Sequence, residues 1–135
     1  MIFVSRLLLS LIIFAGFFVQ VAIAQQLESS YKNWSVYTIN QDGKNLCYIA
    51  SGPIKESGNY SRRDDPYVLV TNISKNVDEV SASSGYSYRK GTEVSVVIDK
   101  NKYKMFTKGE ISWAYDTPQD REMIVRMKKG IKMSI

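Results

Sequence analysis

Three carboxylate side chains are candidates for an acid–base pair. Asp64 and Asp65 adjoin in a polar stretch, and Glu79 opens a later β-prone run. Two such groups held close together can donate and accept protons during hydrolysis of a polymer. The chain has no histidine, so hydrolases of the Ser-His-Asp and Cys-His types are excluded. A small carboxylate-dependent enzyme acting on cell-wall polymers is therefore one hypothesis.

Cys47 is the only cysteine in the chain, so it is unpaired within this chain. Its neighbours Leu46, Tyr48 and Ile49 offer no basic group that would favour a thiolate nucleophile. We expect Cys47 to be a small hydrophobic side chain buried inside a strand. No segment has the dense oxygen ligands of a calcium loop, so we predict neither a metal site nor a cofactor.

Arg62, Arg63, Tyr86 and Tyr88 are the candidate binding residues. The two arginines could clamp an anionic group, or the two aspartates that follow them could neutralise them locally. The two tyrosines fit a recognition surface as well as they fit packing within a sheet. Positive residues are otherwise scattered among carboxylates, although the net charge is +5. This pattern excludes a nucleic-acid footprint.

The elements that would position these residues are short β-prone runs separated by turn residues. Asp42-Gly43 between two such runs predicts a tight hairpin. Residues 51–66 read as a loop, and the continuous apolar run 67–71 predicts a strand covered on both faces. The strand candidates are 34–39, 46–50, 67–71, 79–83, 92–98, 103–107 and 111–115. We expect a mainly β fold, an antiparallel β-sandwich or partly open barrel.

One helix is predicted at 117–129, near the C-terminal end. Thr117 suits the N-cap, Pro118 the first turn, and Gly130 a left-handed termination. An apolar stripe at helical spacing should pack on the sheet. The stripe consists of Met123, Ile124 and Met127.

The first 24 residues read as a secretory signal peptide. Arg6 precedes an apolar run over 7–19, and Ala22-Ile23-Ala24 supplies a small-residue cleavage site. The alternative is an uncleaved anchor, because the run is close to the length that spans a membrane. With cleavage after Ala24, residues 25–135 form a single β-rich domain without a further membrane span. Its location would be periplasmic or secreted, in the cell envelope.

Several segments together resemble the invasion associated locus B family of exported alphaproteobacterial proteins. Their order over residues 31–135 carries the likeness. The segments are Trp34-Ser35-Val36-Tyr37, Cys47-Tyr48, Arg63-Asp64-Asp65-Pro66-Tyr67, Val68-Leu69-Val70-Thr71, Glu79-Val80-Ser81, Gly85-Tyr86, Phe106-Thr107-Lys108-Gly109, Trp113-Ala114 and Met127-Lys128-Lys129-Gly130.

The resemblance implies a β-rich envelope protein with no established reaction, and some relatives take part in host cell invasion and virulence. We therefore expect a non-enzymatic factor that binds an envelope or host-surface component. Relatives continue past the position of Gly130 and many carry a second cysteine. The resemblance thus implies that this domain lacks its last strands, that residues 131–135 present an unpaired strand edge, or even that the chain is a non-functional truncated product.

Overall fold

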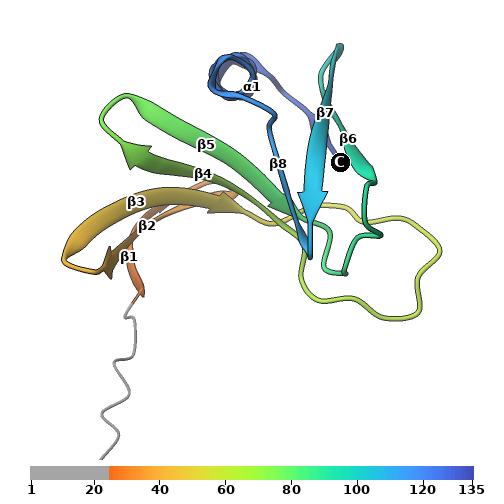
Figure 1. The fold of residues 1–135 in the computed structure, drawn as a ribbon, viewed down its shortest axis with the longest axis horizontal. Coiled ribbons are helices and arrows are strands. Elements are labelled where there is room, and N and C mark those ends of the chain that lie inside the picture. Colours follow the sequence, from red (N-terminus) through yellow and green to blue (C-terminus); the bar gives the residue numbers. More distant parts are fainter. Residues whose placement is uncertain (1–24) are drawn as a thin grey trace, which may run out of the picture.

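The computed structural model describes residues 25–135, and the predicted signal peptide lies outside them. In this range, nine antiparallel strands form one open sheet, accompanied by the helix α1 (Thr117–Lys129) (Figure 1). The strands are β1 (Gln25–Tyr31), β2 (Trp34–Gln41), β3 (Lys44–Ser51), β4 (Tyr67–Ser74), β5 (Val77–Ser83), β6 (Glu93–Ile98), β7 (Asn101–Lys108), β8 (Ile111–Trp113) and β9 (Met133–Ser134). Their order is β1-β2-β3-β4-β5-β8-β7-β6-β9. The predicted mainly β fold class with one C-terminal helix is confirmed.

Consecutive hairpins build β1 to β5. The predicted turn between β2 and β3 is confirmed: Asp42 and Gly43 both have positive φ, 53° and 75°, as a two-residue hairpin turn requires. β1 was not predicted, because its residues are largely polar and all seven are exposed. It is an edge strand, whose backbone pairing with β2 needs no apolar face.

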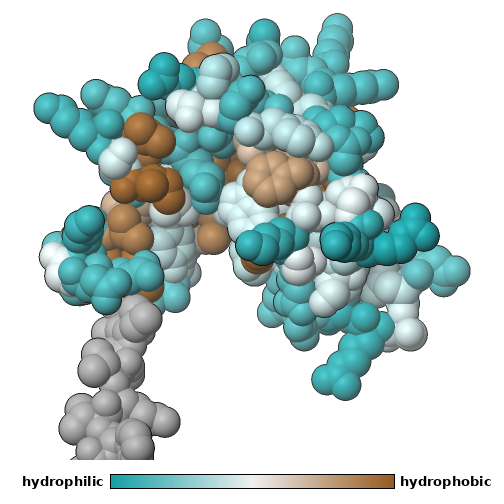
Figure 2. Space-filling model, in the orientation of Figure 1, coloured by the Kyte–Doolittle hydropathy of each residue, from teal (hydrophilic) through white to brown (hydrophobic). Residues whose placement is uncertain are grey.

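The prediction that residues 67–71 are covered on both faces is wrong. β4 is half-buried from Tyr67 to Thr71, because the helix packs on β5 and β6 and leaves β4 largely open. Among the β4 side chains, Val70 reaches the core cluster. Figure 2 shows the consequence, since apolar atoms gather at the surface over the hairpins β2–β3 and β4–β5.

The core lies where β5, β8, β7 and β6 curl around α1. In Figure 1 the helix is seen end-on, with β5 on one side and β7 and β6 on the other. β6 lies within the predicted strand 92–98 and alternates between exposed and buried residues along most of its length, as a strand with one face on the core does. The buried side chains of the apolar core cluster come from β5, β6, β7 and α1 and from the residue after β8. They are Val80, Val94, Val96, Ile98, Met105, Ala114 and Met123.

Both ends of α1 differ from the sequence prediction. Asp116, rather than Thr117, is the N-cap, and its carboxylate accepts a hydrogen bond of 2.8 Å from the Gln119 amide. Gly130 is extended, with φ of −79° and ψ of 162°, and is not left-handed. The chain leaves the helix in this way because Asp99, after β6, accepts hydrogen bonds from the amides of Ile131 and Lys132 at 3.2 and 3.1 Å.

The segment after the helix pairs with the sheet. Met133 lies opposite Ile98 and Ser134 opposite Val97, so β9 extends the sheet beyond β6. The expectation of an unpaired strand at residues 131–135 is therefore wrong for the edge that faces β6, because this edge is paired. The pairing follows from the Asp99 contacts, which hold the chain against the end of β6.

Candidate functional site

The carboxylates singled out from the sequence do not come together. The Asp64 amide donates a 2.9 Å hydrogen bond to the carbonyl of Gly85, just beyond the end of β5. Glu79 lies near the opposite end of that strand, across from Thr71. The hypothesis that Asp64 or Asp65 pairs with Glu79 is therefore wrong.

Glu79 instead has Asp120 of α1 as its carboxylate neighbour. Burial raises the pKa of Glu79, and the charge of Asp120 raises it further, while the side chain of Trp113 acts in the opposite direction. Asp120 lies in the first turn of α1. The proximity of Glu79 and Asp120 could not be predicted from the sequence, because the two residues are far apart along the chain and only tertiary packing brings them together.

Asp120 completes the hydrogen bonding of a strand edge. β8 ends at Trp113, so the Val80 amide on β5 has no strand beside it there. The Asp120 carboxylate accepts that amide at 2.8 Å and is only 7% exposed. Burial raises the pKa of Asp120, although the Val80 hydrogen bond lowers it and the charges of Asp116 and Asp78 raise it. The contact fixes the helix to the sheet.

Neutralising Asp120 should change the pH dependence of stability. An acid whose pKa is raised in the native state holds its proton more tightly there than in the unfolded chain. Its contribution to the stability of the native state is present below the ordinary carboxyl pKa and is lost as the pH rises through the raised pKa.

We expect Asp120→Asn, which keeps an acceptor for the Val80 amide, to reduce this loss of stability between acid and neutral pH, as measured by urea unfolding. Asp120→Ala should cost about 1 to 3 kcal/mol at all these pH values, because it leaves the buried Val80 amide unsatisfied. Equal pH slopes in Asp120→Asn and the parent protein would contradict the assignment.

Arg63 holds the loop of residues 52–66 to the body of the domain. Its guanidinium pairs with Glu56 and lies 4.2 Å from the centre of the Tyr60 ring. It also donates to the Ser84 carbonyl at 3.4 Å. Hydrogen bonding from Arg63 lowers the pKa of Glu56. The predicted neutralisation by the adjacent aspartates is wrong, because the carboxylate partner comes from earlier in the loop. Both terminal nitrogens of Arg63 are thus occupied within the chain, while its buried Nε has no hydrogen-bond partner among the described residues.

The two candidate tyrosines have different environments. Tyr88 donates to the Ser84 hydroxyl at 2.7 Å and packs against the core, so it stabilises the segment after β5. Tyr86 is 47% exposed and meets the Tyr88 ring edge-on, with centroids 5.3 Å apart. Arg62 is exposed and forms no ion pair with the described residues.

Cys47 lies in β3, as expected, but its side chain is exposed. The prediction of a buried thiol is wrong because no element covers β3 on that face. Its strand neighbours are Thr38 on β2 and Asn72 on β4. No charged residue lies directly opposite it.

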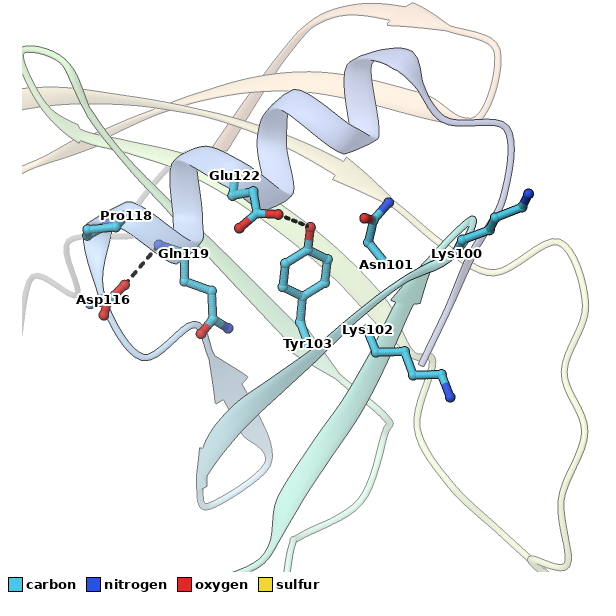
Figure 3. Close-up of a pocket in the computed structure, with 8 residues that line it drawn as sticks. All are labelled: Lys100, Asn101, Lys102, Tyr103, Asp116, Pro118, Gln119 and Glu122. Carbon is cyan, nitrogen blue, oxygen red and sulfur yellow. Dashed lines mark hydrogen bonds between the residues drawn. The ribbon is translucent and has the colours of Figure 1, made fainter.

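A shallow groove of about 600 Å³ lies between the start of β7 and the first turns of α1 (Figure 3). Tyr103 points at Glu122 and donates to its carboxylate at 3.0 Å, which together with burial raises the pKa of Tyr103. The Gln119 side chain donates to the Lys104 carbonyl at 2.7 Å. Lys100 and Lys102 point away from the helix. The polar groups between helix and strand thus bond to one another, and we assign the groove to helix docking.

The remaining site is a group of aromatic rings on the sheet face opposite α1, here called the aromatic surface: Phe106, Trp113 and Tyr115. Phe106 on β7 pairs directly with Trp113 on β8. Their rings stack with centroids 5.6 Å apart, and the Tyr115 ring also lies 5.6 Å from Phe106. The preceding residues on both strands, Met105 and Ser112, are fully buried. Strand alternation therefore directs Phe106 and Trp113 away from the core.

The aromatic surface is accessible and continues into a hollow. Phe106 is 39% and Tyr115 52% exposed. A hollow of about 430 Å³ beside Phe106 is lined by Tyr88, Lys90, Phe106, Thr107, Lys108 and Gly109. In Figure 2 an apolar side chain stands over β8, framed by more polar ones. Strands were predicted at 103–107 and 111–115, but the pairing of β7 with β8, which brings Phe106 beside Trp113, was not predicted.

Comparison of the chain with protein-family models, curated proteins and solved structures gives no match. In residues 25–135, no group of three or more cysteine, aspartate or glutamate side chains is placed to hold a metal ion. The helix in that part of the chain is neither long nor apolar enough to cross a membrane. The geometry of the aromatic surface is therefore the main basis for a function.

Proposed function

We propose that the protein is a non-enzymatic binding factor that engages its partner through the aromatic surface. The observation that carries this proposal is the cluster of Phe106, stacked on Trp113 and in tilted contact with Tyr115, at an exposed face of the sheet. Rigid aromatic rings provide contact area at little cost in conformational entropy. Stacking fixes the rings before a ligand arrives, which lowers the entropic cost of binding further.

The proposal includes the cell envelope as the site of action. It rests on the three-part segment of residues 1–24 and on the resemblance to the invasion associated locus B family. The partner is then an envelope or host-surface component. The N-terminal mass of protein recovered from the envelope fraction tests this location: a chain that begins at Gln25 supports cleavage, and one that retains Met1 makes the segment an anchor.

A carboxylate-dependent enzyme is the second candidate, because Glu79 has a raised pKa and lies near Trp113. Burial in this way can prepare a general acid. The carboxylate that acts on it, however, is Asp120, which already accepts a hydrogen bond from the Val80 amide and is almost fully buried. A second catalytic carboxylate would have to activate water or attack a sugar. Asp120 is poorly placed for either task.

Tryptophan fluorescence can separate binding from catalysis. The chain has two tryptophans, so a Trp34→Phe variant leaves Trp113 as the reporter. We expect a saturable change in its emission with the soluble polysaccharide fraction of bacterial envelopes, because a ligand on the aromatic surface would exclude water from the indole. Adding Phe106→Ala should weaken binding by about tenfold or more, which is typical of a central aromatic contact.

The matched control is Tyr31→Ala, which removes an aromatic side chain that is 74% exposed on the edge strand β1. It should leave the titration unchanged. Mass spectrometry of the same polysaccharide and of soluble muropeptides follows product formation. Digestion of either substrate that is lost in the Glu79→Gln variant would support the enzyme and contradict the binding proposal. Equal binding by Phe106→Ala and the parent protein would show that the binding site is not the aromatic surface.

A further inference from the structure

Lysines flank the aromatic surface on the side of the hollow. Lys104 and Lys108 share the outward face of β7 with Phe106, because strand side chains alternate. Lys90 faces the same hollow as Lys108. Lys104 donates to the Ser95 hydroxyl at 2.7 Å, whereas Lys90 and Lys108 form no ion pair with the described residues. The hollow therefore combines an apolar floor with two positive charges that lack an ion-pair partner there.

A carboxylate lies beside Phe106 on the neighbouring strand β6. Glu93 lies across from Phe106 on β6 and accepts a 2.6 Å hydrogen bond from the Tyr115 hydroxyl. That hydrogen bond raises the pKa of Tyr115. A carboxylate oxygen has more than one lone pair, so Glu93 retains capacity to accept from a further hydroxyl. Around the Phe106 ring, the site thus offers the two lysines of the hollow and a hydrogen-bond acceptor on β6.

We propose that the aromatic surface binds an acidic oligosaccharide, with its carboxylate in the hollow between Lys90 and Lys108 and a sugar ring on Phe106. This inference rests on the proposed function and names the ligand class for the same site. A pyranose presents an apolar C–H face suited to an aromatic ring. It also carries hydroxyl groups that can donate hydrogen bonds to Glu93. An apolar or purely anionic ligand has no such donor. Charge complementarity at the lysine end selects an acidic sugar over a neutral one.

The test uses two ligands with the same sugar backbone, the anionic hexagalacturonate and its uncharged methyl ester. With the Trp34→Phe protein, we expect hexagalacturonate to bind at least tenfold more tightly than the ester at low salt. The preference should shrink at high ionic strength, because these lysines are solvent-exposed. Replacing Lys90 and Lys108 together by glutamine should abolish the preference while binding of the ester is retained.

The matched control removes two charges elsewhere. Lys128→Gln with Lys129→Gln changes the net charge equally but lies in the last turn of α1, so the preference should persist. Equal affinities for the acid and the ester would overturn the acidic class while leaving the aromatic binding proposal intact. Absence of binding by both oligosaccharides, or tighter binding of a hexaglutamate peptide than of hexagalacturonate, would overturn the saccharide inference.

Discussion

Replacing Met123 by alanine is expected to lower the free energy of unfolding by about 2 to 5 kcal/mol. Met123 is fully buried and is the side chain through which α1 enters the core formed by β5, β6 and β7. Truncation removes its apolar contacts and leaves a cavity that the strands cannot fill without moving. Urea unfolding followed by circular dichroism measures the change. We chose Met123 for this substitution because it is the one fully buried apolar side chain that the helix contributes to a core otherwise built from strands and the residue after β8.

Two neighbouring positions on α1 give graded controls. Val125 is 48% exposed, so Val125→Ala should change the unfolding free energy by no more than about 0.5 kcal/mol. Ile124 is half-buried against the core, so Ile124→Ala should fall between the two. A Met123→Ala protein as stable as Val125→Ala would show that α1 does not pack on the sheet in this way.

Gly85→Ala should destabilise the domain by about 2 to 4 kcal/mol. Gly85 has φ of +78°, where an L-residue with a side chain costs about 1 to 2 kcal/mol. A Cβ atom there would also lie 1.9 Å from the carbonyl oxygen of Asp64. The backbone of Asp64 must move to avoid it, which breaks the hydrogen bond from its amide to the Gly85 carbonyl and costs a further ~1 kcal/mol. We expect faster proteolysis within residues 52–66, since that loop would lose its anchor.

Gly91→Ala is the matched control. Gly91 has the same φ of +78°, but a Cβ atom there would meet nothing within 4 Å. It therefore isolates the backbone cost of about 1 to 2 kcal/mol, and the excess in Gly85→Ala measures the close approach to Asp64. Equal destabilisation by the two substitutions, with unchanged proteolysis of the loop, would mean that the loop is not held at Gly85.

The sequence was sufficient for features set by neighbours along the chain. The Asp42-Gly43 turn and the 117–129 helix follow from local preferences for φ and side-chain periodicity, and both are present in the structure. The same local rules missed β1, because an edge strand is stabilised by backbone pairing rather than by its side chains.

Tertiary structure decided which residues meet. The order of strands places β8 between β5 and β7, so that Phe106 and Trp113 stack, and α1 brings Asp120 to the Val80 amide. It also decided burial: Cys47 and β4 are more open than their sequences predict, because α1 covers β5 and β6 instead. A sequence reports the apolar content of a strand, whereas the element that covers the strand is determined by packing between distant segments. The local sequence therefore specified most of the elements, and their long-range contacts specified the aromatic surface.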